Sequence, residues 1–96
     1  MYVWGLLIMS FEKQGYHLRQ DAKKIVLEFM SSNFECSSKN PGMRQANIFR
    51  SCGFDWGEKE NATSSNQQYW VVALLRELES EGKIQRDPTT KLWRLI

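Results

Sequence analysis

The sequence has few of the residues that build metal sites and cross-links: one histidine and two cysteines among 96 residues. A structural zinc site normally uses four cysteine or histidine ligands in closely spaced pairs. His17, Cys36 and Cys52 are too few and form no such pair, so we expect neither a metal nor another cofactor. A disulfide between the two cysteines is conceivable, but a two-cysteine chain is more typical of reduced thiols in a cytoplasmic protein.

The sequence also lacks the motifs of a catalytic site. It has no glycine-rich phosphate loop and no pairing of a nucleophile with a base. His17 lies in a polar stretch, where a surface or capping role is commoner than general-base catalysis. The Glu81-Gly82-Lys83 tripeptide spells the E-x-K half of a metal-dependent nuclease motif, but that motif needs its acid on a strand, and Glu81 ends a predicted helix. We therefore expect no enzyme activity.

No apolar run in the sequence is long enough to cross a membrane. The longest, Tyr2–Met9, falls well short of the roughly 20 residues required. It has neither the basic flank nor the small-residue cleavage site of a signal peptide. Three interpretations remain open: an extra element packed on the domain, a surface covered by a protein partner or by a second copy in a homodimer, or an upstream extension with Met9 as the natural start. We treat residues 1–20 as this apolar extension and expect a cytoplasmic protein.

What the sequence does contain is typical of one small globular domain. Apolar residues make up 42% and charged residues 25% of the chain, which is ordinary composition. The net charge of +2 and the pI near 8.6 are only mildly basic. This balance permits a polyanionic partner without demanding one.

The first predicted helix covers residues 20–33. Its start is predicted at Asp21, whose side chain is a suitable N-cap. Lys23, Lys24 and Glu28 are predicted to face water. Apolar residues at helical spacing form one stripe toward the core: Ala22, Ile25, Val26, Phe29 and Met30.

The next segments predict a short strand near residues 34–36 and a second helix over residues 43–53. In this helix Ala46 and Phe49 are expected to point inward, with Ile48 and Cys52 as further candidates. Gly53, followed by an apolar residue, predicts a helix stop of the Schellman type.

The strongest pattern predicts a third helix over residues 66–82. Val71, Leu74, Leu75 and Leu78 follow the i, i+3, i+4, i+7 spacing of a buried stripe. Trp70 and Ala73 are expected to widen that stripe. A residue between Ser64 and Asn66 can cap the start, and Gly82 is expected to end the helix in the left-handed conformation.

A β-hairpin is predicted to close the chain. Ile84 lies in the first strand and Leu92–Ile96 form the second, with Trp93 and Leu95 on one face. Between them, Asp87-Pro88-Thr89-Thr90 has the residues of a turn, with aspartate at the first position and proline at the second.

The order of three helices and a terminal hairpin is that of a winged helix, in which the hairpin is the wing. The segments "RQANIF", "YWVVALLRELESEGKIQRD" and "KLWRL" resemble the amino-terminal winged-helix domains of Mrr-like restriction endonucleases. The resemblance covers residues 21–96. It implies an α+β, mostly α fold: a three-helix winged helix-turn-helix with a C-terminal β-hairpin wing. One departure is the loop between the second and third helices, which is longer than the short turn of that motif.

The resemblance further implies binding of double-stranded DNA, with the start of the third helix in the major groove. Asparagine and glutamine can pair with adenine, and serine can contact a phosphate or a base. The alternative is that these residues only cap the helix. The residues concerned are Ser64, Ser65, Asn66, Gln67 and Gln68.

The wing carries four basic residues against one acid. Arg86, Thr89, Thr90 and Lys91 are candidates for phosphate or minor-groove contacts, and Arg44 is a candidate from the second helix. Lys83 and Arg94 add positive charge, and Asp87 is the acid. The alternative is a charged edge hairpin that guards against aggregation.

Two functions remain open on the sequence alone. The first is a double-stranded DNA-binding domain from a restriction system or from transcription regulation. The second is a winged helix for protein contact, such as a phage inhibitor or a subunit adaptor. The small net charge, the acidic end of the third helix and the apolar run Tyr2–Met9 favour the second, because each suits a protein partner better than DNA.

Overall fold

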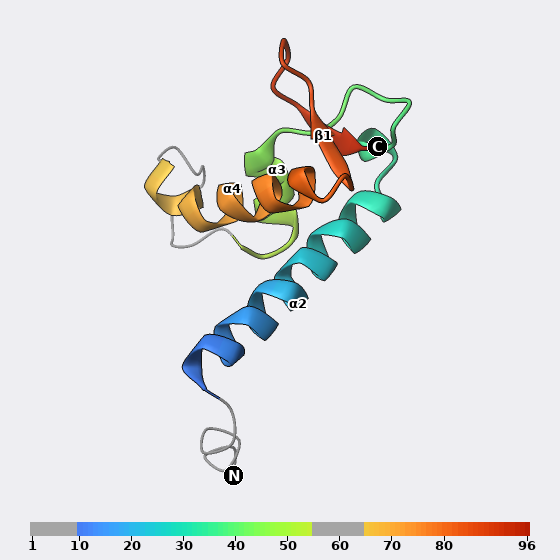
Figure 1. Cartoon of the computed structure of the whole chain (residues 1–96). Coiled ribbons are helices and arrows are strands. Elements are labelled where there is room, and N and C mark those ends of the chain that lie inside the picture. The colour runs from blue at the N-terminus through green and yellow to red at the C-terminus, as the bar shows by residue number, and fades with distance from the viewer. Residues whose placement is uncertain (1–9, 55–64) are drawn as a thin grey trace.

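The computed structural model describes residues 10–54 and 65–96 and shows three α-helices followed by an antiparallel hairpin (Figure 1). This confirms the predicted fold class, α+β and mostly α with a C-terminal hairpin. The elements are α2 (Phe11–Ser32), the short 3-10 helix η1 (Phe34–Cys36), α3 (Gln45–Ser51), α4 (Ser65–Ser80), β1 (Ile84–Arg86) and β2 (Trp93–Leu95).

Helix α2 begins at Phe11, nine residues before the predicted range of residues 20–33. Ser10, not Asp21, is the N-cap, and its hydroxyl accepts a hydrogen bond from the Lys13 N–H at 3.2 Å. The helix runs without a break across residues 20 and 21, where the sequence suggested a boundary between extension and domain. Its amino-terminal half projects away from the rest of the fold (Figure 1). The apolar residues of this half, Phe11 and Leu18, are exposed, so they are not part of the buried stripe on which the prediction relied.

The core lies where α2, α3, α4 and the hairpin meet. Val71, Leu74, Leu75 and Leu78 of α4 are all buried, as their spacing predicted. The other buried residues are Ala22, Lys23, Val26, Met30, Cys36, Met43, Ile48, Phe49, Ile84 and Trp93.

The predicted stripes are too wide. Ile25 is 43% exposed and Trp70 is 39% exposed, and Ala73 is exposed as well. α2 buries Ala22, Val26 and Met30, which lie four residues apart, so its contact face is narrower than the apolar pattern.

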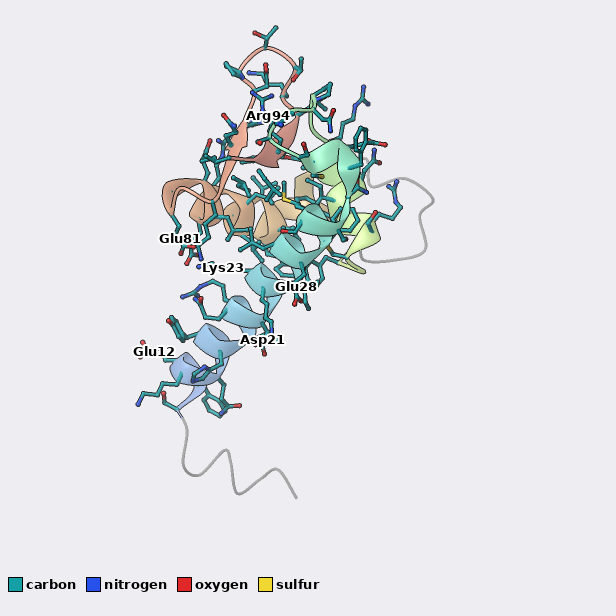
Figure 2. The ribbon with its side chains drawn as sticks, turned by 90° about the vertical axis from the view of Figure 1, so that its right-hand side faces the viewer. Glu12, Asp21, Lys23, Glu28, Glu81 and Arg94 are labelled. Carbon is teal, nitrogen blue, oxygen red and sulfur yellow. The ribbon has the colours of Figure 1, made fainter. Side chains whose placement is uncertain are left out.

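Lys23 is the clearest error of the sequence prediction, because it is buried rather than facing water. Its side chain is 6% exposed and its ammonium contacts the carboxylates of Glu77 at 2.9 Å and Glu81 at 2.6 Å. Arg19 adds a weaker contact to Glu77 at 3.5 Å. The acidic end of α4 is therefore neutralised by α2, as Figure 2 shows for Lys23 and Glu81.

This ion cluster makes stability depend on pH. The hydrogen bond from Lys23 lowers the pKa of Glu77 below its usual value of 4.5, so its stabilising effect is present above pH 4.5 and is lost as the pH falls through the lowered value. Hydrogen bonds to Glu81 and then Glu77 raise the pKa of Lys23 above 10.5, so its effect is lost only in strong base.

We expect Lys23→Met to flatten the acid side of the stability profile, because methionine fills the space without pairing with the carboxylates. Urea midpoints measured between neutral pH and about pH 3 test this. The matched control is Lys24→Met, the exposed neighbour, which should keep the wild-type slope. An unchanged slope in the Lys23 variant would contradict the assignment.

Two glycines end helices as predicted. At Gly53 the φ angle is 75°, its N–H reaches the Arg50 carbonyl, and the Phe54 N–H reaches the Phe49 carbonyl. Gly82, with φ of 76°, repeats the pattern at the end of α4. Both are Schellman motifs, which require a left-handed residue at this position.

The strand predicted near residues 34–36 is wrong, because these residues form the 3-10 helix η1. The side chain of Asn33 accepts a hydrogen bond from the Glu35 N–H at 2.9 Å and caps this turn. Asparagine competes with strand pairing in this way by offering the backbone a local partner.

The hairpin pairs Ile84 with Leu95 and Arg86 with Trp93, and it has a third short partner. Met43, just before α3, forms an antiparallel bridge with Trp93, with the two N–H···O bonds at 2.8 and 2.9 Å. Gly42, the residue directly before Met43 in this bridge, has a φ of 107°. The wing is therefore joined to the segment between η1 and α3.

Candidate nucleic-acid interface

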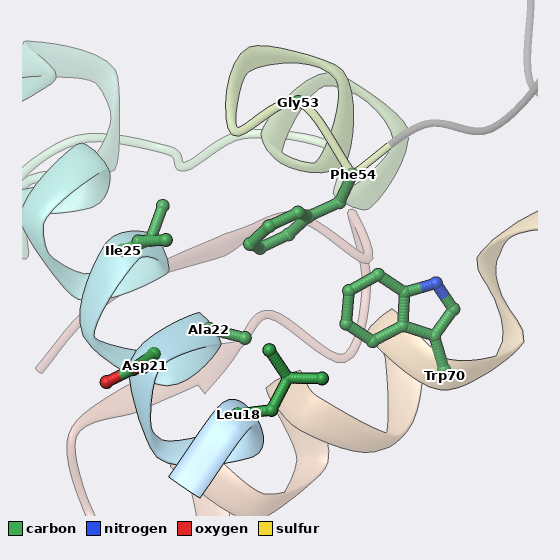
Figure 3. A pocket seen from close by; sticks show the side chains of 7 residues that line it. All are labelled: Leu18, Asp21, Ala22, Ile25, Gly53, Phe54 and Trp70. Carbon is green, nitrogen blue, oxygen red and sulfur yellow. The ribbon is translucent and has the colours of Figure 1, made fainter. Parts of the chain in front are cut away.

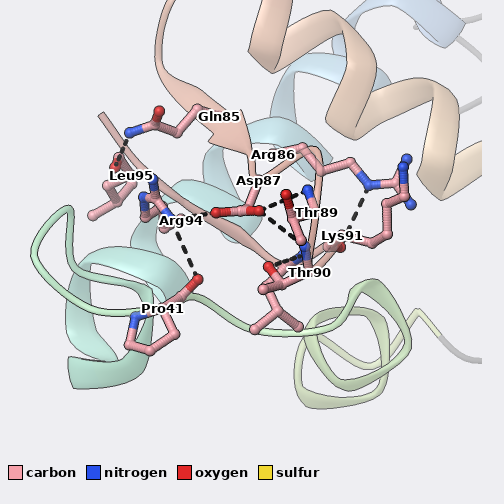
Figure 4. A network of polar contacts seen from close by, with 10 residues as sticks. Pro41, Gln85, Arg86, Asp87, Thr89, Thr90, Lys91, Arg94 and Leu95 are labelled. Carbon is pink, nitrogen blue, oxygen red and sulfur yellow. Dashed lines mark hydrogen bonds and ion pairs between the residues drawn. The ribbon is translucent and has the colours of Figure 1, made fainter.

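The tip of the wing is a closely bonded turn built on Asp87. One carboxylate oxygen of Asp87 accepts hydrogen bonds from the N–H groups of Thr89 at 2.8 Å and Thr90 at 2.9 Å (Figure 4). The Asp87 carbonyl accepts from Lys91, and the Asp87 N–H donates to Leu92. The predicted turn residues are present, and the turn is one residue wider because Lys91 takes the left-handed conformation with φ of 66°.

These bonds decide what the tip can offer to a ligand. The N–H groups of Thr90 and Thr89 hold the pKa of Asp87 below its usual 3.8, so the carboxylate stays charged. Because both N–H groups donate to Asp87, neither is available to a phosphate. The Thr90 hydroxyl accepts from the Leu92 N–H at 3.3 Å and also hydrogen-bonds to the Asp87 carboxylate, so within the described structure the hydroxyl left for a phosphate is that of Thr89.

Arg94 makes its contacts within the protein, where it stabilises the wing. Its guanidinium lies 3.7 Å from the Asp87 carboxylate and donates to the Pro41 carbonyl at 3.5 Å (Figure 4). Arg94 thus offsets the one acid of the hairpin. Lys83, Arg86 and Lys91 form no ion pair with any residue in the described part of the chain.

Trp93 contributes more than core volume, which the sequence prediction missed. Its ring is fully buried and lies beneath two guanidinium groups, Arg76 at 5.3 Å and Arg86 at 5.6 Å from the ring centre. Arg86 also donates to the Lys91 carbonyl at 3.4 Å. Cation–π contact of this kind favours a fixed position for an arginine.

The residues predicted to bind DNA fall into two groups. Arg86, Thr89, Thr90 and Lys91 all belong to the hairpin, and exposed Arg44 lies beside it because Met43 pairs with Trp93. Ser64 lies outside the described residues. The predicted readers Ser65, Asn66, Gln67 and Gln68 form the first turn of α4, and their side chains also lie outside the described part.

These two groups are not one cluster. The hairpin follows the carboxyl end of α4, and the first turn is at its other end (Figure 1). At 1.5 Å per residue, the helix Ser65–Ser80 separates them by about 20 Å.

A separate apolar groove lies between α2 and the segment after α3 (Figure 3). Its cavity volume is about 430 Å³. Two of its aromatic residues are visible in the sequence, but there Phe54 predicts a helix stop after Gly53 and Trp70 predicts a buried position in α4. The groove is lined by Leu18, Asp21, Ala22, Ile25, Gly53, Phe54 and Trp70.

Cys36 and Cys52 are free thiols. Burial raises the pKa of Cys52 to about 11, and Cys36 nearby adds to this effect. The thiol of Cys52 is therefore protonated at neutral pH, which makes it a poor nucleophile.

Within residues 10–54 and 65–96, no three histidine, cysteine or acidic side chains are placed to hold a metal ion. None of the helices described has both the length and the apolar character to span a membrane. No protein-family model, no curated protein and no solved structure matches this chain.

Proposed function

We propose that this protein is a winged-helix domain that binds double-stranded DNA, with the start of α4 in the major groove and the wing on the sugar–phosphate backbone. The observation that carries the proposal is the state of the wing's charges. Its one acid, Asp87, is engaged by Arg94 and by turn N–H groups, while Arg86 and Lys91 have no acidic partner among the described residues. Such cations are suited to neutralising phosphates.

The distribution of acids supports the same proposal. The small net charge and the acidic end of α4 would weaken DNA binding if these carboxylates faced the duplex. Glu77 and Glu81 instead contact Lys23, and Glu79 contacts Arg76 at 3.0 Å. The acids of α4 are therefore compensated within the protein, and the low net charge understates the positive field at the wing.

The spacing of the two groups suits a duplex. The start of α4 and the base of the wing are about 20 Å apart along the helix. Neighbouring grooves of B-DNA are separated by roughly half of the 34–36 Å helical turn. One helix can thus bring its first turn to one groove and the wing to the adjacent backbone.

Lys91→Gly is the sharpest test of this proposal. A left-handed lysine is strained by about 1–2 kcal/mol, and glycine removes that strain, so we expect the variant to fold at least as well as the wild type. We expect its affinity for duplex DNA to fall and the slope of log affinity against log salt to drop by about one. Fluorescence anisotropy with a labelled duplex over a salt series measures both.

Lys24→Gln is the control, because it removes one exposed positive charge from α2, outside the wing. Its salt slope should equal that of the wild type. Gln67→Ala should reduce discrimination between duplex sequences with little change in the salt slope. Absence of any duplex binding by the wild type at low salt would end the proposal.

A restriction or regulatory setting in the cytoplasm follows from the same proposal and not from a separate observation. The second candidate function is protein contact, and the groove beside Leu18 and Trp70 favours it. DNA binding lost in Lys91→Gly and kept in a variant of that groove would show that the two surfaces act separately.

A further inference from the structure

The projecting half of α2 carries an apolar stripe that nothing in the described structure covers. Phe11 is 81% exposed and Leu18 is 71% exposed, and Gly15 lies between them on the same face. Phe11, Gly15 and Leu18 are separated by four and then three residues, and the same alternation continues to Ala22 and Ile25. An apolar repeat that averages 3.5 residues is the seam of a two-helix coiled coil.

Large and small residues alternate along this seam. Phe11, Leu18 and Ile25 are large, whereas Gly15 and Ala22 are small. Two antiparallel copies of α2 can therefore pack with Phe11 and Leu18 each opposite a small residue, which lets the helices approach closely. Phe11 then faces Ala22 of the second copy, and Leu18 faces its Gly15.

The apolar groove provides the site that receives an aromatic ring of the second copy. Its lining includes Ala22, Ile25 and Leu18 of α2 together with Phe54 and Trp70 (Figure 3). A ring placed opposite Ala22 enters this groove, because Ala22 forms part of its floor. The polar residue of the lining is Asp21, so the occupant must be mainly apolar, as Phe11 is.

We propose that the protein forms a symmetric dimer through antiparallel α2 helices, in which Phe11 of each copy fills the groove of the other. A symmetric pair uses the same patch twice, and α2 provides both the ring and the groove that receives it. This surface differs from the wing, so the dimer stands independently of DNA binding.

Charges beside the seam select this register. With Phe11 opposite Ala22, Glu12 of one copy lies beside Arg19 of the other, twice by symmetry. If the second helix were shifted by one heptad toward the core, Arg19 of one copy would lie opposite Arg19 of the other. If it were shifted by one heptad in the reverse direction, Glu12 of one copy would lie opposite Glu12 of the other. Arg19 is half-exposed and its contact with Glu77 is long, at 3.5 Å, so it can serve both carboxylates.

Sedimentation equilibrium over a concentration series tests the proposal. The wild type should rise from the 11.3 kDa of one chain to twice that mass. Phe11→Ala should weaken the dimer by roughly a hundredfold or more, because two buried rings are lost per dimer. Phe34→Ala is the matched control, since Phe34 is 80% exposed but lies in η1, and its dimer constant should not change.

A charge exchange tests the register. Glu12→Arg places two cations together at each site and should weaken the dimer by about tenfold or less. Glu12→Arg combined with Arg19→Glu should restore it, whereas Glu35→Arg in η1 should have no effect. A parallel pair places no acid opposite a base at these positions and would show no such rescue.

Circular dichroism confirms that each variant keeps its helices, so that a lost dimer is not mistaken for a lost fold. A wild type that stays at one chain mass throughout the series overturns the proposal. So does a dimer whose constant is unchanged by both Phe11→Ala and Glu12→Arg, because its interface must then lie elsewhere.

Discussion

Gly42→Ala is expected to destabilise the protein by about 3–5 kcal/mol, although it adds one methyl group. The Cβ would lie 2.5 Å from the Trp93 carbonyl oxygen and 2.9 Å from its carbon. Both are rigid backbone atoms, so the bridge between Met43 and Trp93 must open to make room. A φ of 107° adds strain that alanine cannot relieve.

Urea denaturation measures this loss, and two glycines of the same chain serve as controls. Gly53 and Gly82 also have positive φ, but a Cβ at either meets nothing within 4 Å. Gly53→Ala and Gly82→Ala should therefore cost only about 1–2 kcal/mol, the strain of a left-handed alanine. Equal losses at all three positions would show that the carbonyl contact at Gly42 has no effect.

Trp93→Ala is expected to cost about 3–5 kcal/mol, a large part of the 5–15 kcal/mol typical of a small domain. Trp93 is the largest fully buried side chain. Its removal leaves a cavity under the wing and takes away the ring beneath Arg76 and Arg86. The urea midpoint should fall, and under the proposed function duplex binding should weaken even where the protein remains folded.

Trp93→Phe tests the contribution of an aromatic ring to stability separately from that of the indole N–H. The Trp93 Nε1 atom is buried without a hydrogen-bond partner within the described structure, and an unpaired buried donor is itself destabilising. Phenylalanine loses volume but also removes this donor, so we expect a net change under about 1.5 kcal/mol. A loss as large as that of the alanine variant would mean that the N–H is satisfied in solution.

The features predicted well from sequence are those decided by neighbours in the chain. Gly53 and Gly82 end their helices because the local backbone needs a left-handed residue. Leu74, Leu75 and Leu78 of α4 lie on one narrow face at helical spacing. Asp87 forms the wing turn with N–H groups two and three residues away.

The features predicted badly depend on distant partners. Lys23 is buried because Glu77 in α4 and Glu81 just after it, more than fifty residues later in the chain, contact its ammonium, and the local pattern marks it as exposed. Ile25 and Trp70 are apolar at helical spacing, yet they line a groove, because which part of a stripe is covered depends on how helices cross. The position of the wing relative to Arg44 likewise depends on the bridge to Met43.

The bridge between Met43 and Trp93 also bears on how the wing can be lost. A two-stranded hairpin is marginally stable alone, and this one is tied to residues fifty positions earlier in the chain. Closing so long a loop is entropically unfavourable and is offset only when α2, α3 and α4 have packed. The wing therefore forms and melts with the core in one cooperative unit, and any mutation that weakens the core also lowers the population of molecules that present Arg86 and Lys91.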